Sequence, residues 1–486
     1  MRDYLLLFVG CVLFHVLGTW NLPLIDRDEP RFAEASREMR ERQNYIVPYF
    51  NDQYRFDKPP LTYWMQVASY TVFGENDFAA RFPSTIAAAL TALIIFAWGS
   101  RIRDSRTGIW AAVIFTLSLQ TFLHAKAAVA DMWLVLFMSI AAWAGFELYG
   151  KGKTPNVQRP TSNAQRSGSN VWWLILYMAL ALAFLAKGPI GLLPLIPLIW
   201  KNCRNPTKGF YPRLGFGILL TLGIICLWAI PALVQTHGEF WRVGIGRHVI
   251  GRSVGAMEGH GGKSFGLYLV FLPFYFVMVF ASFFPWSIKL PWLVRTLRKQ
   301  ADATDRYLLC GIVVIFGVFT LVATKLPHYT LPAFPLLALL LARHWCGPSP
   351  VPHTFRRIAI IAAFVWAACA IALPPLVARK FPNPSYALFE QSRNDLQPET
   401  EFASVDYAEP SLVWYFRSRV KGFLISLKPK NVADFMAKPG PRFVIVPTDA
   451  ADGVVQSNPT WKTFSTRGFN IPKGKQVDLT LLLKPE

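Results

Sequence analysis

Long apolar runs recur along the chain and restrict its fold more than any other feature of the sequence. Hydrophobic residues make up 53% of its 486 residues, and short segments rich in Lys and Arg separate the runs. Helices of this length and polarity are stable inside a bilayer. We therefore expect a polytopic α-helical membrane protein. The expected spans are residues 4–20, 79–100, 108–124, 129–149, 171–186, 188–200, 214–235, 265–288, 307–324, 329–344 and 358–378.

The basic residues predict how these spans are oriented. They gather in alternate loops, whereas those of the first polar stretch are balanced by acids. Because Lys and Arg are enriched in cytoplasmic loops, the alternation predicts a cytoplasmic N-terminus, an outer C-terminal region and about eleven to thirteen spans. The formal net charge of +21 then reflects topology, and no nucleic-acid partner is expected.

The last part of the chain has a different character. Strand-like runs at 442–446 and 477–483 alternate with helical patterns at 408–417 and 432–437. This alternation predicts a small α/β domain on the outer side. We therefore divide the chain into a transmembrane domain, residues 1–378, and an outer α/β domain, residues 379–486. The transmembrane domain is expected to contain two large outer loops, residues 21–78 and 236–264.

The most polar part of the N-terminal half is IDRDEPRFAEASREMRERQNYIVPYFNDQYRFDKPPLTYW, residues 25–64. Asp28 is a plausible helix N-cap, and Phe32, Ala35 and Met39 follow at helical spacing. Charged residues cover the other face, which predicts a short amphipathic helix on a membrane surface. Residues 61–73 predict a second interfacial helix. A solvated loop with ordinary surface ion pairs is the alternative.

The order DEPRFAEASREM, IVP and FDKPPLTYW resembles the first periplasmic loop of ArnT-like lipid-linked sugar transferases. These enzymes transfer 4-amino-4-deoxy-L-arabinose and are related to the dolichyl-phosphate-mannose-protein mannosyltransferases of the GT-C class. The resemblance is strong in this stretch and loose in the membrane portion. It implies a GT-C fold and a glycosyltransferase that uses a polyprenyl-phosphate sugar.

The same resemblance implies roles for the first acids of the stretch. Asp28 matches the Asp of the family's Asp-Glu-x-Arg motif and is expected to be the catalytic carboxylate that orients or deprotonates the acceptor. Glu29 and Arg31 complete the motif and are expected to position Asp28. Arg31 is also expected to contact the donor phosphate, since cations stabilise the charge that grows on a leaving phosphate.

The second charged cluster of the stretch supplies further candidates. Lys58 matches the Lys of the family's Lys-Pro motif, which implies a contact with the donor phosphate. Asp57 matches an acid that takes part in a divalent-metal site in ArnT-like proteins, where Glu is commoner. Arg55 stands where those sequences often carry Tyr. These two departures weaken the implied sugar and lipid contacts.

Three later segments also match the family. Asp131 in HAKAAVAD resembles a second GT-C acid near the acceptor site, although an ordinary interface charge is an equal alternative. Lys187 in LAKGPIGLLP matches a Lys-Gly-Pro element, and Lys325 and Tyr329 match the Lys-x-Pro-x-Tyr element in TKLPHYTLPAFP. The family fold implies that Lys58, Lys187 and Lys325 converge on one donor phosphate.

The outer loop 236–264 is rich in Gly and contains several His residues. His260 is the expected metal partner of Asp57, with His248 as second choice, and the metal would be Zn²⁺, Mg²⁺ or Mn²⁺. One His and one carboxylate are few ligands for zinc, so a solvated His is the alternative. The loop also carries three basic residues that would suit anionic head groups or phosphate: Arg247, Arg252 and Lys263.

Together with the predicted topology, the resemblance implies a bacterial inner-membrane glycosyltransferase with its active site on the periplasmic side. Its partners would be an undecaprenyl-phosphate-type donor and an outer-face acceptor such as lipid A, another glycolipid or a protein. The sequence contains no Walker P-loop, HExxH or GxSxG motif, which disfavours ATP-driven transport, metalloprotease and lipase functions. The alternative function is a transporter or flippase of lipid-linked sugars, for which repeat symmetry and charges in mid-membrane would be expected.

Overall fold

The computed structural model describes residues 1–149, 162–251, 265–346, 352–451 and 460–485. The chain divides into two compact units. The first unit comprises Met1–Val16, Phe56–Thr62 and Pro83–Ala367, and the second comprises Leu17–Arg55, Tyr63–Phe82 and Ala368–Glu486. The polar N-terminal stretch therefore contributes to both units, and the predicted division between residues 378 and 379 stays a prediction.

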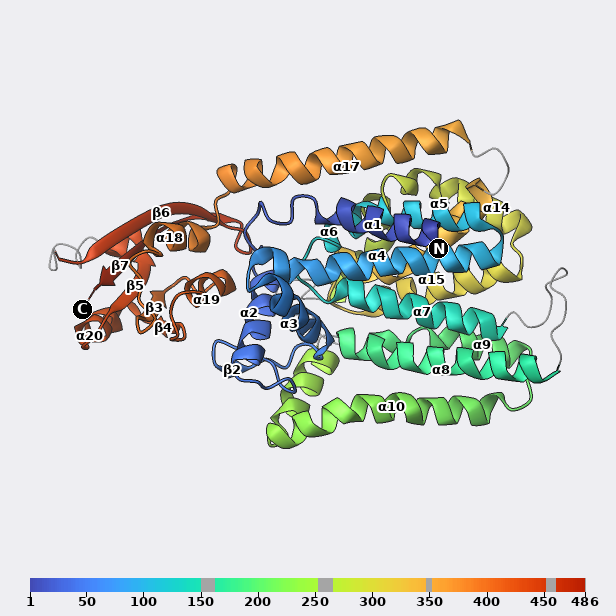
Figure 1. Cartoon of the computed structure of the whole chain (residues 1–486), viewed down its shortest axis with the longest axis horizontal. Coiled ribbons are helices and arrows are strands. Elements are labelled where there is room, and N and C mark those ends of the chain that lie inside the picture. Colours follow the sequence, from blue (N-terminus) through green and yellow to red (C-terminus); the bar gives the residue numbers. More distant parts are fainter. Residues whose placement is uncertain (150–161, 252–264, 347–351, 452–459, 486) are drawn as a thin grey trace. The chain divides into compact units, whose positions relative to one another are not determined.

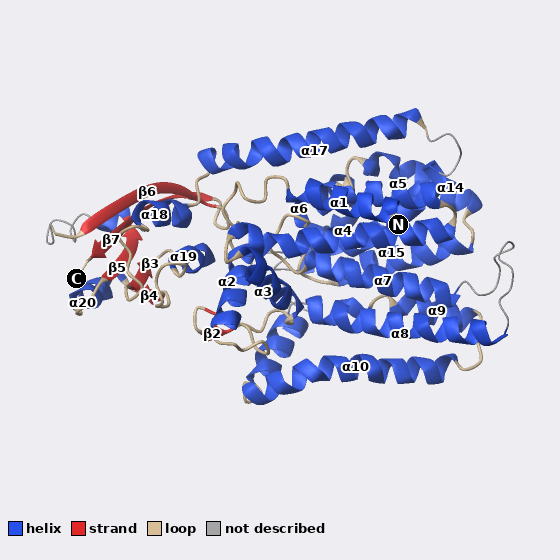
Figure 2. Ribbon diagram, in the orientation of Figure 1, coloured by secondary structure: helices blue, strands red, loops and turns tan. Residues whose placement is uncertain are grey.

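In the described part of the first unit, all regular structure is helical (Figure 1, Figure 2). Two of its helices, α4 and α17, continue into the second unit. Short 3₁₀ and π turns join several of the others. The helices are α1 (Arg2–Val16), α4 (Asp77–Ile102), α5 (Ser105–Thr116), α6 (Leu119–His124), α7 (Asp131–Tyr149), α8 (Ser162–Lys187), α9 (Leu195–Arg204), α10 (Phe210–Gln235), α12 (Phe265–Val270), α13 (Phe274–Ser282), α14 (Leu290–Gln300), α15 (Ala303–Leu321), α16 (Phe334–Leu341) and α17 (His353–Lys380).

Six of these helices, α4, α7, α8, α10, α15 and α17, are long and apolar enough to cross a membrane within the described residues. A seventh span results if the bent pair Phe274–Ser282 and Trp286–Gln300 is counted as one. The predicted polytopic α-helical fold is thus confirmed. The count of eleven to thirteen stays a prediction, because four predicted spans fall on helices of 15 residues or fewer. These spans are 4–20, 108–124, 188–200 and 329–344.

Small residues let helices of the first unit pack closely. Gly99 of α4 and Gly108 of α5 face each other, and a Cβ built on Gly108 would lie 2.3 Å from the backbone oxygen of Phe96. Small residues at such contacts are typical of helix pairs in membranes. A second contact joins α7, α8 and α10 around a shared apolar core that includes Ala144, Leu180 and Phe210.

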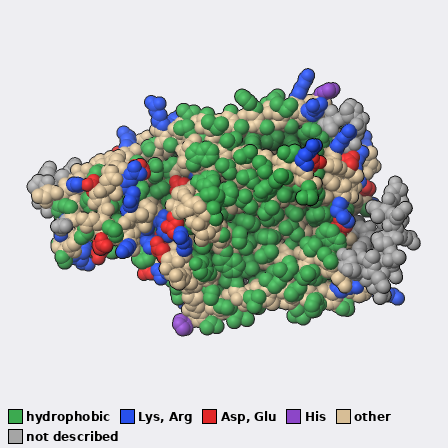
Figure 3. All heavy atoms as spheres, viewed as in Figure 1, with side chains coloured by type: hydrophobic (Ala, Val, Ile, Leu, Met, Phe, Trp, Pro, Cys, Tyr) green, Lys and Arg blue, Asp and Glu red, His purple; other side chains and the backbone are tan. Residues whose placement is uncertain are grey.

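The outer sides of several helices remain apolar. Only 28% of the membrane-crossing window of α10 and 11% of that of α17 are buried. Large exposed side chains on them include Leu227, Val234, Ile360 and Phe364. Hydrophobic side chains cover a broad part of the helical surface in the view of Figure 3. Such a surface is stable against lipid chains and unfavourable in water.

The second unit is built on a five-stranded sheet of order β4-β3-β5-β7-β6 (Figure 2). Strand β3 pairs in parallel with β4 and β5, whereas β7 pairs antiparallel with β5 and β6. The predicted α/β domain is confirmed. Its elements are α2 (Asp28–Glu41), α3 (Leu61–Phe73), α18 (Pro384–Ser392), β3 (Glu401–Val405), α19 (Pro410–Phe416), β4 (Ile425–Leu427), α20 (Val432–Ala437), β5 (Arg442–Pro447), β6 (Lys462–Asn470) and β7 (Lys475–Lys484), with a small hairpin of β1 (Tyr49–Phe50) and β2 (Gln53–Tyr54).

Alternation along the central strands places helices on both faces of this sheet. Phe402 and Phe443 stack on one face, and Phe416 of α19 packs against them. The intervening residues Ala403 and Val444 point to the other face, where they share a core with α20. Because successive side chains of a strand point to opposite faces, the apolar residues of β3 and β5 are buried on both sides of the sheet.

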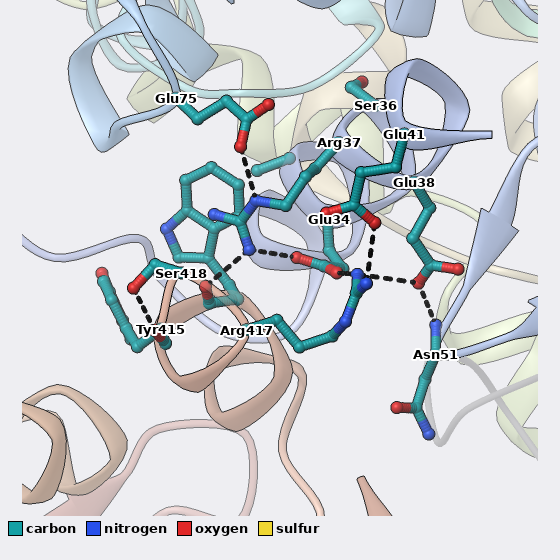
Figure 4. Close-up of polar contacts among 12 residues, drawn as sticks. Glu34, Ser36, Arg37, Glu38, Glu41, Asn51, Glu75, Tyr415, Arg417 and Ser418 are labelled. Atoms are coloured by element: carbon teal, nitrogen blue, oxygen red, sulfur yellow. Dashed lines mark hydrogen bonds and ion pairs between the residues drawn. The ribbon is translucent and has the colours of Figure 1, made fainter. Parts of the chain in front are cut away.

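Helix α2 and helix α19 are joined by buried ion pairs (Figure 4). Glu34 accepts from Arg37 Nη1 at 2.6 Å and from Arg417, and all three side chains are at most 4% exposed. Arg37 also donates to the carbonyl oxygen of Trp414 at 2.8 Å, and Arg417 donates to Glu41 at 2.7 Å. These contacts lie entirely within the second unit.

The prediction for the polar face of this helix is wrong. Phe32, Ala35 and Met39 are buried as expected, but Arg37 and Glu38 are buried as well, at 2% and 0% exposure. The helix is therefore enclosed by protein and does not lie free on a membrane surface. The solvated-loop alternative fails for the same reason. The charges looked solvated because one of their partners, Arg417, lies more than 370 residues further along the chain.

Candidate active site

Asp28 is the first residue of α2, and its side chain is exposed. The N-cap prediction is one residue out, since Arg27 occupies the cap and caps no backbone group with its side chain. At this position the Asp28 carboxylate lies at the positive end of the helix dipole. It is thus available to a substrate while its backbone is fixed in a helix.

Unlike Asp28, Glu29 is buried and forms an ion pair. Its carboxylate accepts from Arg81 Nε and Nη2 at 2.9 and 2.7 Å and from the Ile25 N–H at 2.8 Å. Glu29 is 5% and Arg81 3% exposed. Arg81 also donates to three carbonyl oxygens of the preceding loop, those of Thr19, Leu22 and Pro23. Glu29 therefore holds the loop that leads into Asp28.

Residues at the start of α19 also hold this loop in place. Asp26 accepts from the Ser411 N–H at 2.9 Å and from the Ser411 hydroxyl, and Arg27 pairs with Glu409 at 3.2 Å. Burial raises the pKa of Asp26 to about 7, against the hydrogen bonds from Ser411. The start of α2 is therefore tied to α19 and to the residue before it.

The second charged cluster of the stretch is divided between the two units. Arg55 is buried in the second unit, where Nε donates to the Tyr63 hydroxyl at 2.9 Å and the guanidinium lies 5.2 Å from the Phe32 ring centre. Asp57 and Lys58 are half-buried in the first unit. Lys58 Nζ donates to the carbonyl oxygen of Asp57 at 3.0 Å.

Asp131 and Lys187 meet directly in the first unit. Lys187 Nζ donates to Asp131 Oδ1 at 2.5 Å, and Asp131 is 7% exposed. His328 Nε2 lies 3.8 Å from the same oxygen, and the rings of His328 and His124 are 4.9 Å apart. Two residues chosen from sequence are thus brought together, with two imidazoles that were not chosen.

The charge state of His328 links this group to Lys58. Burial lowers the pKa of His328 to about 3, and the positive charges of Lys187 and Lys58 act in the same direction, opposed by Asp131. His328 is therefore uncharged near neutral pH. Both lysines thus act on the charge of one imidazole.

Lys325 does not join them in this arrangement. Its ammonium donates to the carbonyl oxygens of Phe319, Thr320 and Val322 at 3.1, 2.5 and 2.7 Å. These groups lie at the end of α15, where carbonyls lack helical partners. Tyr329 is nearer to the group, because Lys187 Nζ lies 5.2 Å from its ring centre. The convergence of Lys58, Lys187 and Lys325 on one phosphate stays a prediction, and in this structure Lys325 caps a helix.

A set of possible metal ligands is formed by His124, Asp131 and His328, whose ligand atoms all lie within 4.8 Å of one another. Neutral imidazole and carboxylate suit Zn²⁺ and Mn²⁺. A cation bound there would share Asp131 with Lys187. Among the predicted ligands, His260 lies outside the described residues, as do Arg252 and Lys263, and the side chains of His248 and Arg247 are likewise not described.

Sequence reasoning missed several residues of these sites. His124 and His328 lie inside the segments HAKAAVAD and LPHYTLP, so a local signal was present. Arg81, Glu409 and Ser411 gave none, because each acts through a partner far along the chain.

The overall fold matches that of a solved membrane enzyme. The structure of ArnT from Cupriavidus metallidurans bound to undecaprenyl phosphate superimposes with a TM-score of 0.75, covering 99% of this chain and 98% of that one at 19% identity. The same protein in the apo state gives a TM-score of 0.73. The fold is therefore that of the GT-C membrane glycosyltransferases.

Sequence comparison identifies a matching family and several relatives of the chain. Residues 57–156 match the family described as dolichyl-phosphate-mannose-protein mannosyltransferase. The chain is 28% identical over 372 residues to the undecaprenyl phosphate-alpha-4-amino-4-deoxy-L-arabinose arabinosyl transferase of Enterobacter sp. (strain 638), covering 76% of this chain and 64% of that protein. The enzyme of the same description from Erwinia tasmaniensis is 30% identical over 70% of this chain and 59% of its own. The chain is thus ArnT-like, and it spans less than two thirds of the length of these relatives.

Proposed function

We propose that the protein is a membrane glycosyltransferase that moves a sugar from a polyprenyl-phosphate carrier to an acceptor at the outer face of a bacterial inner membrane. One observation carries the proposal, namely the agreement with the ArnT fold over almost the whole of both chains. The sequence relatives, described as undecaprenyl-phosphate aminoarabinose transferases, support it. In this proposal the N-terminus is cytoplasmic and the active site periplasmic.

The reaction would break the bond between the anomeric carbon and the phosphate oxygen of the donor and form a bond from that carbon to an acceptor oxygen. Negative charge grows on the departing polyprenyl phosphate. Lys58 and Lys187 would stabilise this charge, since ammonium groups form strong hydrogen bonds to phosphate. Arg31 and Lys325 are weaker candidates, and Lys325 would first have to leave the end of α15.

Asp28 would orient the acceptor and take its proton where the acceptor is a hydroxyl. An exposed carboxylate on a fixed helix start suits that task, because general bases act on groups within hydrogen-bond reach. Glu29 and Arg81 would hold the backbone of Asp28 in place. Asp131 would act with Lys187 at the acceptor or donor, as the resemblance implies.

The names of the relatives favour a pentose over a hexose as the transferred sugar. This chain departs from the family pattern at Arg55 and Asp57, so donors of both classes belong in a test. A divalent cation held by His124, Asp131 and His328 would supply further positive charge for the leaving phosphate. The competing metal set, Asp57 with His260 or His248, remains the sequence-based prediction.

A transfer assay tests the proposal. Membranes containing the wild type or Asp28→Asn would receive a panel of polyprenyl-phosphate pentoses and hexoses, and mass spectrometry would follow released polyprenyl phosphate and modified lipid. Loss of the carboxylate should lower turnover at least about 100-fold, the usual scale for a general base. Asp434→Asn, which neutralises an exposed acid of α20, is the matched control and should keep full activity.

The alternative function gives the opposite result. A flippase of lipid-linked sugars would release no polyprenyl phosphate and would tolerate Asp28→Asn. If both proteins behave alike with every donor, the transferase proposal fails.

A further inference from the structure

A mainly apolar cavity of about 460 Å³ lies in the first unit between α1, α5 and α17. Helix α17 runs along the edge of the helical bundle at this place (Figure 1). Gly10 and Phe14 line the cavity from α1, Trp110 and Val113 from α5, and Ala363 from α17. Three helices that are separated in the sequence thus border one apolar space.

Two aromatic contacts hold α17 at a distance from the bundle on either side of this cavity. Near the start of α17, the ring centres of Phe355 and Trp110 are 4.9 Å apart. Eleven residues later, the Trp366 ring stacks on Phe122 at 5.5 Å. Trp366 Nε1 also donates to the carbonyl oxygen of Leu117 at 2.9 Å. The helix is therefore fastened at two points, with the cavity between them.

Small residues face the cavity between these two contacts. Ala359 and Ala363 line it from α17. On α1, a Cβ built on Gly10 would meet no atom of another helix within 4 Å in the described part of the chain. Small residues usually let helices in membranes approach closely. Here the large aromatic side chains prevent that approach, so the space is built into the packing of α17.

The wall of the cavity suits a hydrocarbon chain. Cys11 and Thr116, two of the polar residues in the wall, form a hydrogen bond with each other between Sγ and Oγ1 at 3.5 Å. A water molecule needs several polar partners in such a cavity, and an empty space would deprive the wall of dispersion contacts. A chain from the bilayer would restore those contacts.

The stretch between the two aromatic contacts is about as long as one acyl chain. At a rise of about 1.5 Å per residue, Phe355 and Trp366 are about 16 Å apart along α17. One leaflet of the hydrocarbon core of a bilayer is about 15 Å thick. One chain of a phospholipid can therefore lie along α17 between these residues.

A cation marks one end of the cavity. Arg356 lines it from the first turn of α17, and its side chain is exposed. Among the residues whose side chains the structure describes, none forms an ion pair with Arg356. Basic pockets between membrane helices bind the head groups of acidic lipids, because a guanidinium forms strong hydrogen bonds to phosphate. The charge at this end therefore complements an anionic head group.

The donor lipid of the proposed reaction belongs to the other end of the bundle. Glu147, near the end of α7, pairs at 2.7 Å with Arg101, near the end of α4, and α5 with Trp110 follows directly. Asp131, which begins α7 and pairs with Lys187, lies about 24 Å from Glu147 along that helix. The charged end of the cavity and the proposed catalytic group thus lie toward opposite ends of the helices.

We propose that this cavity binds one acyl chain of an anionic phospholipid, with the lipid phosphate held by Arg356. The lipid fills the space between α17 and the bundle and stabilises α17 in its position. This site goes beyond the proposed function, because it is distinct from the sites of the donor and the acceptor and does not depend on the transfer reaction.

Binding of defined lipids to the full-length protein tests the proposal. Protein stripped of lipid in a nonionic detergent would receive phosphatidylglycerol or phosphatidylcholine with the same acyl chains. Native mass spectrometry would measure the bound lipid, and a thermal scan would give the Tm. We expect one phosphatidylglycerol to bind in preference and to raise the Tm, because a ligand of the folded state stabilises it. Equal binding of both lipids would overturn the assignment of an anionic lipid.

Two variants locate the site. Arg356→Gln should weaken phosphatidylglycerol binding about tenfold, the usual effect of losing a charged hydrogen bond, and leave phosphatidylcholine binding unchanged. Arg357→Gln, which changes an exposed Arg outside the cavity wall, is the matched control. Ala363→Phe fills the cavity and should abolish the rise in Tm with phosphatidylglycerol. Arg356→Gln changes an exposed side chain, so it decides the matter even where Ala363→Phe does not fold.

Three results would overturn the proposal. If Arg356→Gln and Arg357→Gln lose affinity equally, the lipid is attracted by a basic surface and not by this site. If Ala363→Phe folds and binds phosphatidylglycerol like the wild type, the lipid lies elsewhere. If polyprenyl phosphate displaces phosphatidylglycerol, and Lys58→Gln leaves that displacement unchanged, the cavity holds the donor lipid instead.

Discussion

Two clusters of charged residues, one in each unit, differ in what their charges can do. In the second unit, Glu34, Arg37 and Arg417 form ion pairs at no more than 4% exposure, with Glu41 at the edge. In the first unit, Asp131 faces the ammonium of Lys187 and two imidazoles. The first group matches acids with guanidinium groups that never lose their charge. The second contains two imidazoles, whose nitrogen lone pairs can bind a metal or accept a hydrogen bond.

The same contrast exists within one motif, between acids that form buried ion pairs and the acid that is proposed to act in catalysis. Glu34 and Glu38 belong to the same DEPRFAEASREM segment as Asp28, yet both are 0% exposed and bound to protein. Asp28 alone of these three is exposed. The acids of the motif therefore differ in their surroundings: most of them fasten α2 within its unit, whereas the first is exposed and is the one proposed to meet the substrate.

The largest effect should come from Arg417→Met. Removing Arg417 leaves Arg37 as the one guanidinium bound to Glu34 and takes a nearby positive charge from the buried Glu38. Loss of one partner of a buried ion pair costs about 3–5 kcal/mol. We expect little monodisperse protein on size-exclusion chromatography and a markedly lower Tm for what remains.

The double variant Glu34→Gln with Arg417→Met sharpens this test. It removes both charges of this pair, while Arg37 keeps its ion pair with Glu75 at 3.1 Å. Part of the lost Tm should be recovered, because a neutral pair of similar volume is tolerated better than a buried acid that has lost one of its guanidinium partners. If Arg417→Met alone is as stable as the wild type, the cluster does not hold α2 and the comparison fails.

Substitutions in the cluster of the first unit should lower transfer activity strongly and lower the Tm only slightly. Asp131→Asn keeps the side-chain volume and still accepts a hydrogen bond from Lys187, so the Tm should fall less than for Arg417→Met. Transfer should fall by about 100-fold, the scale of losing one preorganised electrostatic group. Glu147→Gln is a matched control at the other end of α7, because Glu147 forms an ion pair with Arg101 at 2.7 Å. Equal activity of Asp131→Asn and Glu147→Gln would contradict the catalytic assignment.

Several parts of this organisation could be predicted from the sequence. Apolar length predicted the main spans, and the strand-like runs at 442–446 and 477–483 predicted β5 and β7 to within two residues at each end. Asp28, Lys58, Asp131 and Lys187 were chosen as site candidates because each lies in a recognisable motif, and the structure brings Asp131 and Lys187 together.

The missing parts share a physical cause. Arg417 forms an ion pair with Glu34 although more than 370 residues separate the two in the sequence. No local sequence pattern predicts such a partner. Lys325 binds backbone carbonyls, which every residue supplies, so its role as a cap leaves no trace in residue types. His124 and His328 were overlooked although they lie in segments already chosen, since a lone His predicts little until a second ligand is placed beside it.

Metal binding tests the cluster of the first unit through a smaller and more selective effect. Replacing one ligand of a three-ligand set should weaken the affinity for Zn²⁺ at least about tenfold, measured by competition with a chromogenic chelator. The variant is His328→Gln, and the control is His353→Gln, which changes an exposed imidazole at the start of α17. If His328→Gln binds Zn²⁺ like the wild type and Asp57→Asn does not, the sequence-based metal site is the correct one.

The smallest expected effect concerns the pH dependence of the second unit. Burial raises the pKa of Asp26 to about 7, so between about pH 4 and pH 7 the folded state binds a proton that the unfolded state has lost. Stability contributed by Asp26 is therefore greatest at low pH and falls as the pH rises through this window. Asp26→Asn cannot ionise and keeps a carbonyl acceptor for Ser411, so its Tm should exceed that of the wild type at pH 8 and approach it at pH 5. A Tm difference that is the same at both pH values would show that Asp26 is ionised in the folded protein, which would make it one more paired charge of the structural kind.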